Sequence, residues 1–503
     1  MEPMSRSIIR EEGSPVNLMQ LLEKNQQVHF QILAMFFREG SEISYKKIAK
    51  KLSVSAPTVQ KEMQNLAASL QAFHQDAMIS NGENDRVHLT LPVDFDLREF
   101  LYQYLSEAID FKILSYVFFH REESTTKMML ELVLSEASLF RHFKTINTLL
   151  AEFEIQLKNK KLVGDERQIR FFFFQFFAES YPAAKIKSHF SRASTDNLIR
   201  VIEGQLAIKL SKGQTARLSL WFGLMEARFD YRGSQQHDGS YELLKSLEND
   251  ADFQVLRNVM GRYLSRFAVS WSDYETLYLY LFLLAEGIIV PSLPDTDSAH
   301  FFWSQISKSN TVLLQALNDM TPGRHQEEVL FSMLTTISVQ SIYQQGSIVA
   351  FAELQPETVS NTHDLTTSQQ AIAALAKQSG QVYSAEKIQH LVNELLLVQD
   401  WLQVKQEQKF IVGILLSQSQ LRSAFLRRFL IKELAGYPNI HFEEAPTVVY
   451  DLLIVDHPEI AEGYHYKKQM ILTGGANPFE EARLHAIVEK IRRNNLESEL
   501  ERV

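Results

Sequence analysis

The clearest hydrophobic pattern in the chain is a pair of short amphipathic helices separated by a polar turn, within Ile43–Leu70. Apolar side chains recur there every three or four residues, which is the spacing of one buried helix face. Ser55 can cap the second helix, and Pro57 suits its first turn. Two further apolar runs in Ala77–Leu91 flank a polar Asn-Gly tip and predict a β-hairpin. Helix, turn, helix and hairpin together predict a winged helix-turn-helix unit over 15–92.

The same pattern returns at an offset of 80 residues, in Lys127–Leu150. Residues of matching character there are Met129, Leu132, Ser135, Ser138, Leu139, Phe143 and Ile146, which correspond to Ala49, Leu52, Ser55, Thr58, Val59, Met63 and Leu66. A second hairpin, with a basic tip, follows in Glu154–Gly164. Agreement at many positions with one constant offset indicates an internal repeat. The sequence therefore predicts a second winged unit over 93–170.

From Asp165 to about Leu402 the periodicity is almost purely helical, with a proline-containing break near 291–294. This predicts two helical bundles, 171–292 and 298–402. Beyond them, the apolar runs Lys409–Leu416 and Asp451–Val455 are separated by an amphipathic helix at Gln418–Leu434. Alternation of strand and helix predicts a small α/β domain with a parallel sheet, over 408–503. The predicted fold class is mainly α and multidomain.

Charge changes this picture in one region. The whole chain carries a net charge of −10, but Ser44–Lys61 holds five lysines and no acidic residue. A local basic patch on an acidic molecule is what a surface that contacts phosphates requires. This predicts double-stranded DNA as a partner of the winged units.

The residues expected to contact DNA lie one step away from the buried helix register, at the helix start or on a hairpin tip. In the first unit they are Lys46, Lys47, Ser55, Thr58, Gln60, Lys61 and Gln64; in the second they are Ser138, Arg141, His142, Lys144, Thr145, Lys158, Lys160 and Lys161. Arginine and glutamine can read base edges, whereas lysine and serine mostly hold phosphates. The alternative is that some of these side chains are ordinary solvated surface. Because Arg141 and a basic wing belong to the second unit, that unit is expected to be the principal reader.

Composition excludes several other classes of protein. The chain has no cysteine, so disulfides, thiolate nucleophiles and cysteine-based zinc sites are absent. The sequence contains no dinucleotide or Walker glycine loop, no G-x-S-x-G elbow and no H-E-x-x-H pair, and we expect no enzyme, no cofactor and no metal. Gly474-Gly475 before a helix can cradle an anion, although a tight turn explains it as well. The amino terminus is not a signal peptide and no apolar run approaches the about 20 residues that span a bilayer, so a cytoplasmic location without membrane contact is expected.

These features resemble the Mga/AtxA regulators of Gram-positive bacteria. The likeness lies in the two winged units, the segment Gly164–Phe177 (GDERQIRFFFFQFF), two helical bundles and a small α/β tail. The second winged unit and the Gly-Asp-Glu-x-x-Ile-Arg segment match at the level of motifs. The resemblance implies that the bundles are phosphotransferase-system regulation domains and that the tail is an enzyme IIB-like module. It further implies a homodimeric regulator of virulence or of carbohydrate response.

The same resemblance implies phosphorylatable histidines in the bundles, and the sequence departs from it there. The expected positions hold Trp221, Phe282, Met333 and Asn393. The end of the first strand of the tail has Ser417 where an enzyme IIB has its cysteine. Among the scattered histidines, His325 and His390 are the candidates for phosphorylation.

Two hypotheses from different classes remain. The first is a sequence- or shape-dependent DNA-binding transcriptional regulator that receives its input through the helical bundles. The second is a phosphotransfer or docking protein of a sugar phosphotransferase system, whose partner would be a phosphocarrier protein and which would not bind DNA directly. The missing histidines and cysteine count against the second hypothesis.

Overall fold

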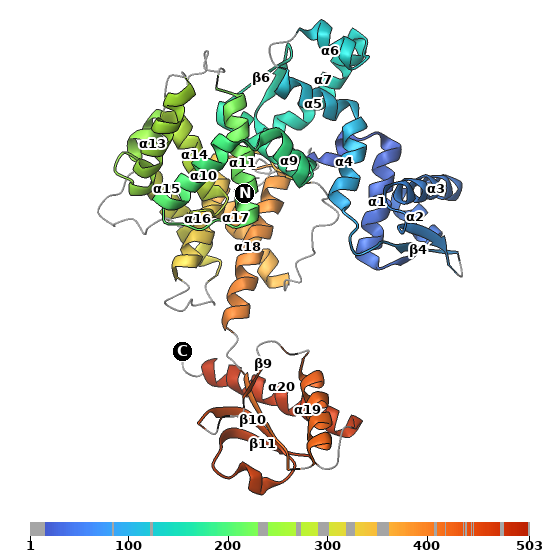
Figure 1. Ribbon diagram of the computed structural model, residues 1–503, viewed down its shortest axis with the longest axis vertical. Coiled ribbons are helices and arrows are strands. Elements are labelled where there is room, and N and C mark those ends of the chain that lie inside the picture. The colour runs from blue at the N-terminus through green and yellow to red at the C-terminus, as the bar shows by residue number, and fades with distance from the viewer. Residues whose placement is uncertain are drawn as a thin grey trace, which may run out of the picture. The chain divides into compact units, whose positions relative to one another are not determined.

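The computed structural model (Figure 1) describes most of the chain. The described residues are 16–82, 85–120, 124–229, 240–267, 273–289, 301–317, 327–349, 362–406, 410–417, 419–435, 437, 440–443, 445, 447–472 and 477–500. They form two compact units, Met1–Gln399 and Asp400–Val503. Among them, no helix is both long enough and apolar enough to cross a membrane.

The chain begins with the first winged helix-turn-helix. Its elements are β1 (Val16–Asn17), α1 (Lys24–Glu39), β2 (Glu42–Ser44), α2 (Tyr45–Leu52), α3 (Ala56–Phe73), β3 (Met78–Asn81) and β4 (Arg86–Thr90). Strands β2, β3 and β4 form an antiparallel sheet in the order β2-β4-β3. The predicted hairpin is therefore confirmed, and β2 adds a third strand to it.

The second winged unit repeats this order with a smaller sheet. Its elements are α4 (Leu97–Glu107), α5 (Ile109–Phe119), α6 (Thr125–Glu131), α7 (Glu136–Leu150), β5 (Gln156–Lys158) and β6 (Lys161–Val163). In Figure 1, α6 and α7 lie at one extremity of the helical region and α2 and α3 at another.

The internal repeat extends to the helix caps. Ser55 accepts a hydrogen bond from the Thr58 amide at the start of α3, and Ser135 accepts one from the Ser138 amide at the start of α7. The turn before each helix contains one left-handed residue, Ser53 with φ 54° and Val133 with φ 55°. Caps and turns therefore recur at the same offset of 80 residues as the apolar pattern, and the two units share one backbone design.

Helices make up the rest of the first compact unit. They are α8 (Glu166–Ser180), α9 (Ala183–Phe190), α10 (Ala193–Gln205), α11 (Lys212–Ala227), α12 (Ser240–Ser246), α13 (Ala251–Leu264), α14 (Asp273–Ala285), α15 (Phe301–Gln315), α16 (Glu327–Tyr343), α17 (Thr362–Ser379) and α18 (Ala385–Gln406), which continues past Gln399. The phenylalanine side chains of α8 are buried, so this run belongs to the core. A short strand, β7 (Ile348–Val349), pairs in parallel with β1 and joins the start of the chain to this region.

The second compact unit is the predicted α/β domain with a parallel sheet. Its elements are β8 (Phe410–Leu415), α19 (Gln420–Leu434), β9 (Ile440–Glu443), β10 (Val449–Val455), β11 (His465–Ile471) and α20 (Pro478–Leu500). The strand order is β11-β10-β8-β9, with every pair parallel. The sequence prediction missed β9, a four-residue edge strand whose side chains are only partly buried. Gly474 and Gly475 lie outside the described residues.

Candidate nucleic-acid interface

Each winged unit holds its second helix by one apolar stripe and leaves the opposite face to solvent. The buried apolar side chains of α3 are Val59, Met63, Leu66 and Leu70, and those of α7 are Leu139, Phe143, Ile146 and Leu150. Seven of these eight positions, all except Leu150, were expected from the three- and four-residue spacing and the internal repeat. The faces opposite these stripes are the candidate recognition surfaces.

In the first unit, the predicted contact residues on α3 are exposed. Gln60, Lys61 and Gln64 point away from the core. Ser55 and Thr58 are also exposed, but their hydroxyl oxygens lie 2.7 Å apart at the helix cap, so they primarily stabilise the start of α3. At the start of α2, Lys46 and Lys47 carry the other predicted cations, and Lys47 forms an ion pair of 2.6 Å with Glu39.

In the second unit, Arg141, Lys144 and Thr145 are exposed on α7, and Ser138 lies near its start. His142, the remaining predicted contact residue of α7, is engaged within the unit. Its Nδ1 lies 2.7 Å from an Asp110 carboxylate oxygen on α5, and the side chain is partly buried against that helix. His142 therefore packs within the unit, with its Nδ1 engaged by Asp110.

The position equivalent to His142 in the first unit is Glu62, and it makes the same kind of bridge with the charges exchanged. The Glu62 carboxylate lies 3.1 Å from Nε2 of His29 on α1, and both side chains are buried. Burial lowers the pKa of His29, although its hydrogen bond to Glu62 acts in the opposite direction. Burial likewise raises the pKa of Asp110, opposed by its hydrogen bond to His142. Each recognition helix is thus fixed to an earlier helix of its unit by a carboxylate–imidazole pair.

Lys160 lies at the tip of the second hairpin, as predicted, but its side chain is buried. Lys158 and Lys161 are exposed on the second hairpin, but Lys160 is only 4% exposed, and its ammonium lies 5.3 Å from the ring centre of Tyr116 on α5. Asn159 and Lys160 both have positive φ, 49° and 63°, which is the conformation of a two-residue type I′ turn. We infer that this tight turn directs the Lys160 side chain back toward α5, which leaves Lys158 and Lys161 as the exposed lysines of the hairpin.

The two units differ in charge at matched positions. The lysines of α2 at 46, 47, 50 and 51 correspond in α6 to Thr126, Lys127, Leu130 and Glu131, so α6 keeps one lysine of the four. The exposed face of the first unit is therefore much more basic, which favours phosphate contacts there. The second unit keeps Arg141 and Lys144 on its recognition helix.

Comparison with known proteins agrees with this arrangement. The profile of the Mga helix-turn-helix domain matches residues 15–82 and 93–177. The two winged units belong to the Mga helix-turn-helix domain family. A curated protein of Streptococcus pneumoniae serotype 4 (strain ATCC BAA-334 / TIGR4), described as "Putative trans-acting regulator", is 23% identical over 217 residues. The match covers 42% of this chain and 43% of that protein, so it spans less than half the length of either.

The second Mga segment ends within α8, and the start of α8 carries a buried network of ions. Arg170 donates two hydrogen bonds to Glu275 (2.6 and 2.9 Å) and one to Glu166 (2.9 Å). Arg228 donates two more to Glu166 (2.7 and 2.6 Å). Burial would raise the pKa of Glu166, but Arg228 and Arg170 outweigh it and hold this pKa below its ordinary value. The network joins α8 to the end of α11 and the start of α14. The i,i+4 spacing of Glu166 and Arg170 agrees with their contact, whereas nothing in the sequence indicated the contacts with Arg228 and Glu275.

Two of the positions where the resemblance implies phosphorylatable histidines lie face to face. The rings of Trp221 and Phe282 are stacked, with centroids 4.3 Å apart and an interplanar angle of 13°. Phe174 packs edge-on against both rings. All three side chains are almost completely buried. The pair is a packed aromatic core and offers no imidazole nitrogen that could accept a phosphoryl group.

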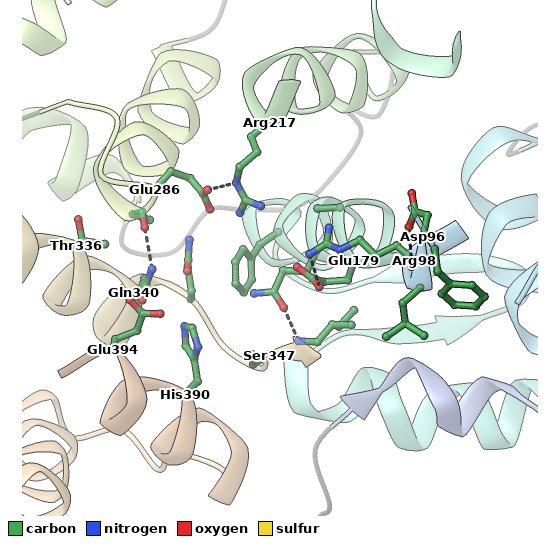
Figure 2. Close-up of a pocket in the computed structure, with 18 of the residues that line it drawn as sticks. Asp96, Arg98, Glu179, Arg217, Glu286, Thr336, Gln340, Ser347, His390 and Glu394 are labelled. Carbon is green, nitrogen blue, oxygen red and sulfur yellow. Dashed lines mark hydrogen bonds and ion pairs between the residues drawn. The ribbon is translucent and has the colours of Figure 1, made fainter. Parts of the chain in front are cut away.

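A cavity of about 1000 Å³ lies in the first compact unit, and His390 is one of its lining residues. Figure 2 shows Arg217 bonded to Glu286 on one wall and Arg98 beside Glu179 on another, at 4.0 Å. Burial lowers the pKa of His390, opposed by Glu394 and Glu286. The guanidinium groups of Arg217 and Arg98 are thus both paired with carboxylates. His325, the other predicted phosphorylation candidate, lies outside the described residues.

The sequence predicted no metal site. Within the described part of the second compact unit, Glu433, Glu481 and His485 place one ligand atom each within 4.8 Å of one another. His485 also shares a hydrogen bond of 2.8 Å between its Nδ1 and the Tyr437 hydroxyl. These are common features of a helix surface, and the three groups carry no further sign of a bound ion.

Proposed function

We propose that the chain is a transcriptional regulator that binds double-stranded DNA in a sequence- or shape-dependent manner and catalyses no reaction. The observation that carries the proposal is the pair of Mga helix-turn-helix units, each of which exposes polar and basic side chains on the helix face opposite its buried stripe. The description of the streptococcal relative as a trans-acting regulator supports the same function. The proposed contact residues are Lys46, Lys47, Ser55, Thr58, Gln60, Lys61, Gln64, Ser138, Arg141, Lys144, Thr145, Lys158 and Lys161.

We propose that the regulatory signal is received by two helical regulation domains, 171–292 and 298–402. An enzyme IIB-like domain follows at 408–503. Homodimerisation, a cytoplasmic location and a role in virulence or carbohydrate response are part of the proposal. Support for this regulatory input comes from the cavity, whose walls include Val93–Arg98 at the start of the second winged unit as well as α8, α16 and α18. A ligand bound there would contact both the DNA-binding and the helical parts of the first compact unit.

The alternative, a phosphotransfer protein that interacts with a phosphocarrier, has weaker support. It needs an accessible phosphoacceptor, whereas Trp221 and Phe282 are buried in a ring stack. His390 faces a cavity that also holds Glu286 and Glu394, and two nearby carboxylates disfavour an added phosphoryl group by like-charge repulsion. Incubation with a labelled phosphocarrier protein tests this alternative, because labelling of any histidine would support it.

The DNA-binding proposal is tested by fluorescence anisotropy with genomic duplexes recovered by footprinting, over a range of salt concentrations. Wild-type binding should weaken steeply with salt. The Arg141→Ala/Lys144→Ala pair should weaken binding by about tenfold or more and reduce the salt slope by about 0.9 for each phosphate that is no longer neutralised. The matched control is Arg200→Ala/Lys209→Ala, which removes one arginine and one lysine from the helical region. Equal binding by both pairs would exclude α7 as a DNA-contacting helix.

A further inference from the structure

The second winged unit exposes three large apolar side chains around its helix-turn-helix. Leu130 at the end of α6 is 75% exposed, Val133 in the turn is 88% exposed, and Phe140 on α7 is 54% exposed. The Phe140 ring lies edge-on to its neighbour Phe143, with centroids 6.1 Å apart. These side chains are therefore presented outward by a packed helix and turn.

The first unit serves as an internal control for these positions. At the offset of 80 residues, the counterparts of Leu130, Val133 and Phe140 are Lys50, Ser53 and Gln60. Both units have the same caps and the same left-handed turn residue, so the fold does not require apolar side chains there. Exposed apolar surface is unfavourable in water, and its presence on one copy of the repeat only points to something that covers it.

The surrounding charges indicate what that occupant is. Arg141 follows Phe140 directly, and Lys144 lies one helical turn further along α7. Any surface that covers Phe140 closely also removes water from these two cations. A DNA groove compensates this cost with phosphates and base acceptors, whereas a typical protein surface does not. Apolar side chains on a recognition helix contact the C5-methyl group of thymine in the major groove.

We propose that Phe140 reads a thymine methyl group in the major groove, with Leu130 and Val133 covering the adjacent edge of the same site. The first unit, with Gln60 at the matched position, reads its bases through hydrogen bonds. This inference rests on the proposed DNA-binding function and adds to it the kind of base that the second unit selects. The two units then recognise DNA by different chemistry although they share one fold.

The test uses a footprinted duplex in two forms, one with thymine and one with uracil in its place on both strands. Uracil keeps every hydrogen-bonding group of thymine and lacks only the methyl group. Burial of one methyl group is worth about fourfold in affinity, so wild-type protein should bind the uracil form more weakly by about fourfold for each methyl contacted. In Phe140→Ala this preference should fall to about onefold, that is, no preference. Phe140→Gln, which installs the residue type of the first unit, should abolish it as well.

The matched control is Gln60→Ala, which should weaken binding to both forms equally and keep the wild-type preference for thymine. Phe140 is more than half exposed, so thermal unfolding of the Phe140 variants should match that of the wild type and exclude a folding defect. A preference for thymine that persists in Phe140→Ala would overturn the inference and leave DNA binding intact. Absence of wild-type binding to any duplex would instead overturn the proposed function itself.

Discussion

Removal of a single charge from the buried network at the start of α8 should destabilise the helical region strongly. Arg170 is 3% exposed and its guanidinium donates to Glu275 and Glu166, while Arg228 completes a set of two cations and two anions. Glu275→Gln keeps the shape of the side chain but leaves one uncompensated buried positive charge. Breaking a buried ion pair in this way costs about 3–5 kcal/mol. Replacing both partners, as in Arg170→Met/Glu275→Leu, should cost much less for this pair, because neither of its charges is left behind.

Native-state hydrogen exchange of α8 and α14 is the suitable assay, since a chain with two compact units need not unfold in one step. Glu275→Gln should lower the opening free energy of both helices by about 3 kcal/mol or more. The control is Glu42→Gln, which breaks the Arg86–Glu42 pair, where both side chains are roughly half exposed (55% and 43%). That variant should change local stability by about 1 kcal/mol or less. Similar losses of stability in Glu275→Gln and Glu42→Gln would refute the argument from burial.

Three further outcomes are expected. Burial lowers the pKa of Lys387 to about 7 from its ordinary value of 10.5, so between these two values the unfolded chain binds more protons than the folded chain. The thermal midpoint of the wild type relative to that of Lys387→Met should therefore rise from about pH 6 to about pH 9. A difference in midpoints that does not change with pH would contradict this. Gly413→Ala should destabilise the second compact unit by about 1–3 kcal/mol, because its Cβ would lie 2.5 Å from Leu453 Cδ1; hydrogen exchange should accelerate in β8 and β10 and stay unchanged in α8. His142→Ala should lower the stability of the second winged unit by about 1–2 kcal/mol, because the hydrogen bond to Asp110 is removed. The same variant should leave the salt dependence of DNA binding unchanged. A weaker salt dependence would show that His142 contacts a phosphate.

Local sequence patterns predicted much of this architecture. Serine caps, the proline of α3 and apolar residues at helical spacing act within a few residues of one another, so both helix-turn-helix units and their hairpins could be predicted. The strands β8 and β10 were recognisable because they are largely buried and read as continuous apolar runs. The edge strand β9 has no such run, since its side chains alternate between partly buried and exposed.

What escaped prediction depends on contacts between distant segments. His142 lies at the border between the buried and exposed faces of α7, where helical periodicity does not distinguish solvent from a neighbouring helix. Its contact with α5 follows from the position of Asp110, which the sequence pattern does not show. The burial of Lys160 depends on the turn type at the hairpin tip and on Tyr116 beside it. The ion pair of Arg170 and Glu275 joins positions 105 apart in the sequence, and no local pattern specifies such a meeting.

The same network has a mechanical consequence for the second wing. Only Gly164 and Asp165 separate the end of β6 from the start of α8, and Asp165 caps that helix through the Arg167 amide. Glu166, the first residue of α8, is held by Arg228 of the helical region. The connection between the second hairpin and α8 is therefore short and held by hydrogen bonds at its helical end. A movement of α11 or α14 that displaces the start of α8 would therefore also displace the hairpin, and Lys158 and Lys161 would move with it.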